Sequence, residues 1–296
     1  MASGNQAPGH TPKWLRHHRR VTQQEMRKEV TTISERTRNI ALRVRSLSGR
    51  LDEMQNEFAE QAKERAAART QLWSRLNGIP ITVVQETHAT QELIAQVKTA
   101  RAPMPSPGGW AMDASSLLAF LYVVHQEQPG LVVECGSGSS TVWIAYVLEE
   151  LGKGRILSLE HDPAYADETR AQLRLHNLES WASVIDAPLV PQGHLPGAPV
   201  WYDLSNLPAG LPGVDLLLVD GPPAYVGNNA RYPAVPVMEP RLADSAAVVL
   251  DDTGRPDEQV VLERWMQDFS ELTLAPMQAA RAAFMMWNRH THQGPS

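Results

Sequence analysis

The sequence is poor in cysteine and has no long apolar run. Its 296 residues include one cysteine, Cys135, so an internal disulfide is excluded. No apolar stretch reaches the ~18 residues that a membrane-spanning helix needs. The first 20 residues also lack the apolar core of a signal peptide. These absences predict a soluble, cytoplasmic protein without a transmembrane segment.

The two parts of the chain carry net charges of opposite sign, because each has few residues of one charge. Residues 1–102 carry 17 Lys and Arg against 10 Asp and Glu, whereas residues 103–296 carry 10 against 23. A basic segment therefore precedes an acidic globular part. Because an acidic surface is a poor match for a phosphate backbone, nucleic acid is not the expected substrate.

A heptad pattern of apolar residues occupies the basic segment. Apolar residues recur at alternating steps of four and three from Met26 to Phe58, with Thr37 as the one polar member. This spacing predicts a coiled-coil helix over residues 21–76, after a disordered basic tail over 1–20. It leaves three possibilities open: a homo-oligomer, another helical partner, or a helix packed on its own globular domain.

Breaker residues divide the helical part from the rest. The letters NGIP at 77–80 predict the end of the first helix, with Gly78 just beyond it and Pro80 following. We expect a second helix over about 82–101 and a Pro- and Gly-rich linker, which together fill residues 77–108. The globular domain is then predicted over 109–296.

Strand and helix patterns alternate through the globular part. Short apolar runs followed by helical patterns of 10 to 15 residues are typical of a doubly wound, mostly parallel α/β sheet. In such a sheet, ligands bind beyond the carboxyl ends of the strands. The predicted strands cover 131–135, 155–160, 181–186, 214–220 and 246–251, with a closing pair at 272–275 and 282–287; the predicted helices cover 114–127, 139–151, 163–177, 232–243 and 257–269, and an insertion covers 188–213.

The first of these strands ends in a glycine-rich loop with the letters ECGSGSST. Gly136 and Gly138, on either side of Ser137, allow a tight turn and a close approach of a ligand to the backbone. A dinucleotide-binding loop would carry a third glycine where Thr141 stands. The carboxylate of Glu134 disfavours a pyrophosphate and suits a ligand that carries an ammonium or a sulfonium group.

The next two strands also end in acids. Glu160 follows Gly138 at about the 20-residue spacing of an acid that binds ribose hydroxyls. Asp186 ends the third strand, where the amino group of an adenine would lie. Together with the loop, these acids predict a cationic adenosyl ligand, S-adenosylmethionine. The alternative is an ordinary α/β turn with solvated acids.

Four motifs carry a resemblance to a known family. Over about residues 110–290, the chain resembles class I S-adenosylmethionine-dependent methyltransferases. The stretches that match the successive motifs of that family are, in chain order, VVECGSGSST, LSLEHD, DLLLVDGPP and VVLDD. The resemblance implies a seven-stranded, Rossmann-like sheet after the helical arm. It also implies these cofactor contacts: Gly136 and Gly138 beneath the cofactor, Ser140 near its amino acid end, Glu160 on its ribose, and Asp186 and His161 at its adenine.

Three further carboxylates end neighbouring strands. Asp220 ends the fourth strand, and Asp251 and Asp252 end the fifth. Three uncompensated acids repel one another, so a cation is expected, and oxygen ligands suit Mg²⁺. This arrangement resembles the metal-dependent O-methyltransferases, which implies Mg²⁺ on these residues and a hydroxyl of a small molecule or sugar as acceptor. Alternatively, Asp252 or Thr253 caps the next helix.

The stretch after Asp220 departs from that family, because it lacks the histidine often present there. The general base therefore stays open, with His161 and His194 as candidates. Arg231 and Tyr232 either face the substrate or open the next helix. We predict a methyltransferase in which Asp220 binds the metal or orients the acceptor.

Three other functions stay open. The letters DGPPAY resemble the Asp-Pro-Pro-Tyr motif of amino-directed methyltransferases, so N-methylation is an alternative. A degenerate domain that serves as a coiled-coil scaffold is another. A dehydrogenase of related fold is the third.

Overall fold

The structure is a computed structural model that describes residues 13–97, 99–109, 111–196, 199–277 and 281–289. Contacts divide the chain into two units, Met1–Gly78 and Ile79–Ser296, here called the arm and the globular unit. Within the described residues, we find no helix with the length and apolar character needed to cross a membrane. The tail predicted as disordered lies outside the described residues up to residue 12, and the chain is helical from Lys13.

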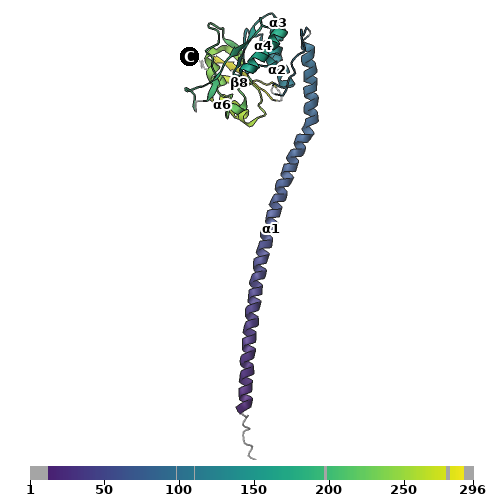
Figure 1. Cartoon of the computed structure of the whole chain (residues 1–296), viewed down its shortest axis with the longest axis vertical. Helices are drawn as coiled ribbons and strands as arrows, with labels where there is room; N and C mark the ends of the chain where they lie inside the picture. Colours follow the sequence, from purple (N-terminus) through teal and green to yellow (C-terminus); the bar gives the residue numbers. More distant parts are fainter. Residues whose placement is uncertain (1–12, 98, 110, 197–198, 278–280, 290–296) are drawn as a thin grey trace, which may run out of the picture. The chain divides into compact units, whose positions relative to one another are not determined.

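From Lys13 on, the arm is part of a single helix, α1 (Lys13–Gln96), which continues into the globular unit (Figure 1). The predicted helix end at 77–80 is therefore wrong. A proline inside a helix removes one backbone hydrogen bond and favours a bend, but it does not have to end the helix. The NGIP letters mark the division between the two units rather than the end of a helix.

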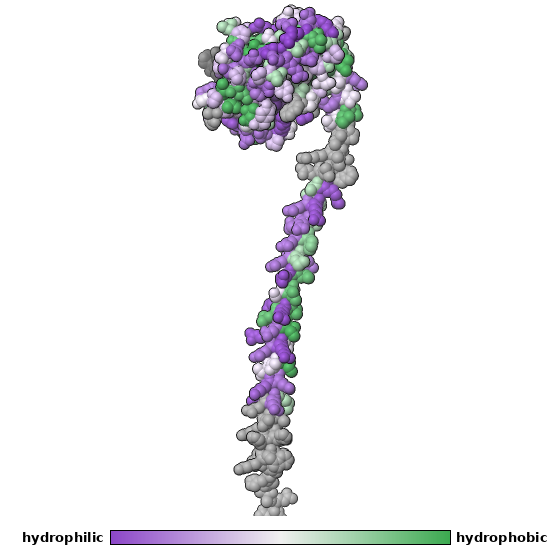
Figure 2. Space-filling view, viewed as in Figure 1, coloured by the Kyte–Doolittle hydropathy of each residue, from purple (hydrophilic) through white to green (hydrophobic). Residues whose placement is uncertain are grey.

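The apolar residues of the heptad pattern lie exposed on one face of the arm. Their exposed fractions run from 53% to 66%, and Figure 2 shows them as an apolar stripe along a polar helix. We call this stripe the seam. It consists of Met26, Val30, Ile33, Thr37, Ile40, Val44, Leu47, Leu51, Met54 and Phe58.

The globular unit is built on the predicted seven-stranded, mostly parallel sheet. Its order is β3-β2-β1-β6-β7-β9-β8, and β9 runs antiparallel to both of its neighbours. The strands are β1 (Leu131–Cys135), β2 (Arg155–Glu160), β3 (Ala182–Asp186), β6 (Val214–Val219), β7 (Leu242–Leu250), β8 (Leu272–Leu274) and β9 (Ala283–Asn288). The doubly wound fold class is confirmed, including the closing pair of strands.

Four longer helices of the globular unit lie close to their predicted positions. They are α2 (Ala114–Glu127), α3 (Ser139–Leu151), α4 (Pro163–Leu175) and α6 (Pro256–Asp268). The helix predicted over 232–243 is much shorter. It is reduced to α5 (Ala234–Met238), and the 3-10 turn η2 (Glu239–Arg241) leads directly into β7. Pro233, Pro236 and Pro240 explain this difference, because each lacks the amide that a longer helix would need.

The predicted insertion contains a small antiparallel hairpin. It is formed by β4 (Leu189–Pro191) and β5 (Val200–Tyr202). A 3-10 turn, η1 (Ala224–Val226), follows β6. Both segments lie after strands that end at the carboxyl edge of the sheet, where the candidate site was expected.

The last part of α1 belongs to the core of the globular unit. Ala89 and Leu93 are buried in the apolar layer on one face of the sheet. The Glu86 carboxylate accepts a hydrogen bond of 2.8 Å from the Ala114 amide at the start of α2. The predicted linker and domain start at 109 were therefore too late in the chain, because the globular unit begins at Ile79.

Candidate active site

The loop between β1 and α3 takes its shape from glycine. Gly136 has a φ of +96°, which an L side chain rarely tolerates. Its amide donates to the Leu159 carbonyl at 2.9 Å, so the loop is tied to β2. Gly138 is the N-cap of α3 and donates to the Thr141 hydroxyl at 3.0 Å. The loop therefore forms a tight turn at the carboxyl edge of the sheet, as predicted.

Glu134 lies beneath this loop rather than facing a ligand. It is fully buried. The hydroxyls of Ser140, Thr141 and Ser158 each donate to its carboxylate at 2.5 Å. Burial raises the pKa of Glu134 to about 7, although these hydrogen bonds oppose the rise. The prediction of direct cofactor contact is corrected: Glu134 holds the loop and the start of α3 from below.

Glu160 forms one wall of the site. One of its oxygens accepts from the amide and the hydroxyl of Ser137, at 2.9 and 3.1 Å. The other accepts from the amides of His161 and Asp162, at 2.8 and 3.0 Å. Burial alone would raise the pKa of Glu160, but hydrogen bonds from the His161 side chain and from the Asp162 and Ser137 amides outweigh it, and the pKa is lowered. The carboxylate is therefore anionic at neutral pH.

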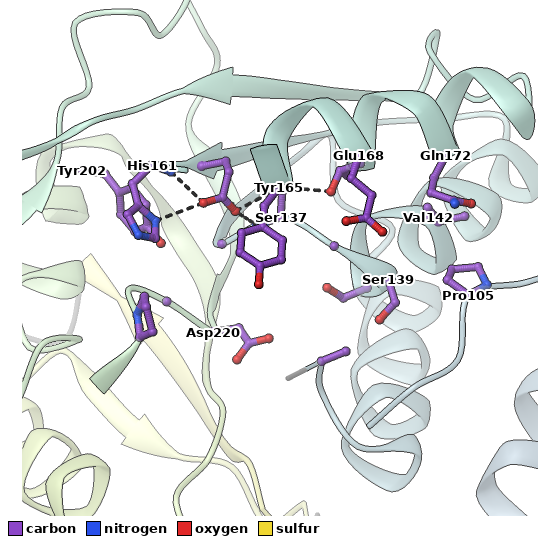
Figure 3. Close-up of a pocket in the computed structure, with 18 of the residues that line it drawn as sticks. Pro105, Ser137, Ser139, Val142, His161, Tyr165, Glu168, Gln172, Tyr202 and Asp220 are labelled. Carbon is purple, nitrogen blue, oxygen red and sulfur yellow. Dashed lines mark hydrogen bonds and ion pairs between the residues drawn. The ribbon is translucent and has the colours of Figure 1, made fainter. Parts of the chain in front are cut away.

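A cavity of about 410 Å³ opens between the loop, the end of β2, α4 and the end of β6. Figure 3 shows Asp220 and Tyr165 directed toward its centre, with His161 and Tyr202 on one side and Ser139, Glu168 and Gln172 on the other. Its walls include the predicted site residues Gly136, Ser137, Gly138, Ser140, Glu160, His161 and Asp220. Seven of the residues that the sequence singled out therefore line one cavity.

Asp186 does not belong to this wall. Its carboxylate is largely exposed and pairs with Arg170 at 2.6 Å. Although Asp186 is the register partner of Glu160 on the neighbouring strand, the two carboxylates have different surroundings. The predicted contact with adenine is not supported. The candidate base His194 also lies outside the cavity wall, exposed in a turn of the insertion.

Tyr202 is a wall residue that sequence reasoning missed. It is buried, and the edge of its ring meets the His161 ring at a centroid distance of 6.1 Å. Its hydroxyl has no hydrogen-bond partner within the described part of the chain. A side chain at Gly221 would collide with that hydroxyl and lie 3.1 Å from the Cys135 carbonyl, so glycine is required there. The aromatic pair Trp201-Tyr202, inside a Pro- and Gly-rich insertion, was the available signal.

The three acids at the ends of β6 and β7 meet as predicted. Asp220, Asp251 and Asp252 offer carboxylate oxygens that all lie within 4.8 Å of one another. Burial, opposed by Arg231, raises the pKa of Asp220 to about 7. Burial and the two neighbouring carboxylates raise the pKa of Asp251 to about 9. Asp220 is the member of this acid cluster that lines the cavity.

Arg231 lies inside the acid cluster, in neither of its two predicted places. Its side chain is only 4% exposed. One guanidinium nitrogen, Nη2, lies 3.3 Å from an oxygen of Asp220 and 3.0 Å from an oxygen of Asp252. The same nitrogen donates to the Asp220 carbonyl, and Nη1 donates to the Asp251 carbonyl, at 2.8 and 3.0 Å. A buried cation therefore already joins the two strand ends.

Two further arginines form ion pairs with Asp252. Arg255 lies 2.8 Å from one of its oxygens, and Arg281 lies 3.7 Å from the other. The N-cap of α6 is Arg255, so the alternative that Asp252 or Thr253 caps this helix is wrong. Magnesium was expected because three carboxylates would otherwise lack a cation. The donor atoms suit Mg²⁺, but the reason for expecting an ion does not hold once these arginines are in place.

The glycine loop and the acids at the strand ends fall within a stretch that matches a known protein family. Residues 133–253 match the family described as "Methyltransferase domain". No curated protein matches the chain. Among solved structures, an O-methyltransferase from Bacillus cereus in complex with SAH is 16% identical and covers 69% of this chain and 89% of its own, with a TM-score of 0.44.

Two other structures are similar at the same level. The O-methyltransferase TomG of Streptomyces achromogenes, in complex with SAM, is 17% identical, covers 60% of this chain and 80% of its own, and has a TM-score of 0.45. The SAH-bound methyltransferase PaMTH1 of Podospora anserina is 14% identical, covers 72% and 95%, and has a TM-score of 0.47. Similarity at this level does not identify a substrate or a metal for this chain.

Proposed function

We propose that this protein, whose residues 133–253 match the methyltransferase-domain family, transfers a methyl group from S-adenosylmethionine to a hydroxyl of a small molecule. One observation carries the proposal. The glycine loop, the Glu160 carboxylate and the Asp220 carboxylate border the same cavity. An anionic wall suits a cationic sulfonium ligand and disfavours a diphosphate.

The cofactor is held by residues at two strand ends. Glu160 accepts hydrogen bonds from the ribose hydroxyls, because its lowered pKa keeps it ionised. The glycine loop allows the backbone to approach the amino acid end of the ligand, near Ser140. His161 packs on the adenine, and Tyr202 supports the His161 ring from its edge.

Methyl transfer itself needs positioning and one proton acceptor. The acceptor oxygen attacks the methyl carbon in line with the bond to sulfur, that bond breaks, and the cofactor leaves as neutral S-adenosylhomocysteine. Asp220 orients the acceptor hydroxyl and takes its proton. A pKa of about 7 suits this exchange at neutral pH. No step of this mechanism passes through a metal ion.

Titration calorimetry with S-adenosylhomocysteine tests the proposal through a matched pair of variants. Glu160 and Asp186 are register partners at the ends of adjacent strands, but Glu160 alone of the two lines the cavity. We expect Glu160→Gln to weaken binding at least tenfold, because it removes an ionised acceptor. Asp186→Asn should leave the affinity within about twofold, because this contact is exposed.

The outcomes separate the competing functions. If the unaltered protein fails to bind S-adenosylhomocysteine at millimolar concentration, the domain is degenerate and the scaffold function holds instead. A change in NADH fluorescence on addition of the protein would favour a dehydrogenase. A methylated amine product, identified by mass spectrometry of turned-over acceptor libraries, would replace O-methylation with N-methylation.

We also propose that the arm pairs with a second copy of this chain through its seam. Successive residues of the seam alternate between the two heptad positions that form the core of a coiled coil. The first core position holds Val30, Thr37, Val44, Leu51 and Phe58, and the second holds Met26, Ile33, Ile40, Leu47 and Met54. An exposed apolar seam in water is stabilised when a partner covers it.

The charges beside the seam favour a parallel pair. One flank carries Arg36, Arg43 and Arg50, at successive heptads, and the other flank carries the neutral residues Ala41, Ser48 and Gln55. Parallel copies bring each arginine against a neutral residue of the partner. Antiparallel copies in register bring arginine against arginine, which is unfavourable.

Sedimentation equilibrium of the full chain tests the pairing. Ile40 lies in the seam and is 62% exposed, whereas Leu42 lies on the opposite side of the same turn and is 59% exposed. We expect Ile40→Glu to convert the dimer to monomer and Leu42→Glu to leave the mass unchanged. A monomeric unaltered chain would refute the pairing and favour a different helical partner.

A further inference from the structure

We infer that the guanidinium of Arg231 takes the place of a divalent cation in the acid cluster, so that this chain binds no metal ion there. This inference rests on the proposed function, because its consequence is a methyl transfer that needs no metal ion. Its test does not require turnover. It concerns Asp220, Asp251 and Asp252, the residues that the sequence assigned to Mg²⁺.

The first argument is position. A single nitrogen of Arg231 lies within 3.3 Å of carboxylate oxygens from two members of the cluster, Asp220 and Asp252. An ion that bridged these two carboxylates would occupy the space next to that nitrogen. A divalent ion would then face a fixed positive charge at close range in a buried site, where electrostatic repulsion is strong.

The second argument is charge. The ion pairs of the cluster join Arg231, Arg255 and Arg281 to Asp220, Asp252 and Glu258. Arg281 also pairs with Asp113, at 3.8 Å. Glu258 is itself buried and lies 3.8 Å from Arg231. Two of the three carboxylates that would bind a divalent ion, those of Asp220 and Asp252, are therefore already paired with fixed cations.

The third argument is that arginines already contact both carboxylate oxygens of Asp252. Arg231 and Arg255 share one oxygen of Asp252, and Arg281 approaches the other. Mg²⁺ needs short bonds in a near-octahedral arrangement and would have to displace these arginines. Arg231 also donates to the carbonyls of Asp220 and Asp251. It therefore fixes the two strand ends, which is the structural work that a bridging ion would do.

Binding of Mn²⁺ to the full chain, followed by the electron paramagnetic resonance signal of the free ion, tests the inference directly. Mn²⁺ reports on the same oxygen sites as Mg²⁺. We expect the unaltered protein to leave the free-ion signal undiminished. Arg231→Leu removes the internal cation and should create a single binding site that quenches the signal.

Two further variants serve as controls. Arg255→Leu removes an arginine that is 41% exposed and contacts Asp252 from outside, and it should create no site. Arg231→Lys keeps a positive charge in the cluster and should also stay metal-free. Stoichiometric Mn²⁺ binding by the unaltered protein that Asp251→Asn abolishes would overturn the inference.

The unaltered protein decides the question if Arg231→Leu fails to fold. Its affinity for S-adenosylhomocysteine should be the same in EDTA and in excess Mg²⁺. An affinity that falls at least tenfold in EDTA and returns with Mg²⁺ would overturn the inference. Failure to bind S-adenosylhomocysteine under both conditions would count against the proposed function alone, because the Mn²⁺ titration is independent of the cofactor.

Discussion

The arm and the globular unit use apolar residues in opposite ways. The seam leaves its aliphatic and aromatic side chains more than half exposed, whereas the strands of the sheet bury theirs almost completely. The globular unit therefore has its own core, with an apolar layer on each face of the sheet. The arm gains comparable stability only by pairing, because a lone helix in water gains little from its exposed apolar face.

Helix α1 contains both exposed and buried apolar residues, so the two environments can be compared by mutation within one helix. Leu47 belongs to the seam and Leu93 to the core of the globular unit. The same residue type in the same helix thus has two environments. The difference lies in what covers the side chain and not in helix propensity.

The largest expected effect comes from substituting these two leucines. Leu93→Ala should lower the free energy of unfolding of the globular unit by about 2 to 5 kcal/mol, because it leaves a cavity in a packed core. Leu47→Ala should leave that transition unchanged. Urea unfolding followed by near-ultraviolet circular dichroism measures both. Equal losses from the two variants would mean that the arm and the globular unit unfold as one.

A pH effect of similar or smaller size is expected from Glu134. Its folded pKa of about 7 lies above its ordinary value of 4.5. The stability it contributes is therefore complete at acidic pH and is lost as the pH rises through 7, by up to about 3 kcal/mol. Between about pH 5 and pH 8, unfolding of the globular unit should become easier.

Glu134→Gln should flatten that dependence. The residual slope would then come from Asp220 and Asp251, whose raised pKa values act in the same direction. Urea midpoints across the pH range check the prediction. Midpoints that rise between about pH 5 and pH 8 would mean that Glu134 is ionised in the folded protein at acidic pH.

The smallest expected effects come from two glycines and differ in sign. Gly136 has a φ of +96°, so Gly136→Ala should destabilise the globular unit by about 1 kcal/mol or more. Gly49 lies in α1, and an added Cβ would contact no neighbour. Gly49→Ala should stabilise the arm helix by about 0.5 to 1 kcal/mol. Thermal unfolding that moves in the same direction for both variants would contradict this account.

The sheet was predictable from sequence because its signals are local. Each buried parallel strand appears as an apolar run, and each longer helix has a clear start, such as the Asp113 cap, which accepts from the Ser116 amide. Local signals also failed. Gly78 and Pro80 predicted a helix end that the structure does not have, whereas three prolines reduced the helix predicted at 232–243.

The site was predictable to the extent that strand ends converge. Glu160 and Asp220 reach the cavity because parallel strands end at one edge. The partners of each acid were not predictable, because the folded arrangement and not the chain order decides which side chains meet. Asp186 pairs with Arg170 outside the cavity, and Glu134 accepts hydrogen bonds from surrounding hydroxyls. Arg231, from a loop, pairs with Asp252 in the acid cluster.

Hydrogen exchange of the full chain with and without S-adenosylhomocysteine tests the central claim most directly. The claim is that the cofactor binds between the glycine loop and the ends of β2 and β6. The account predicts added protection of amides in residues 134–141 and 158–165, with none in the seam. Protection confined to other segments, or no change at saturating ligand, would contradict it.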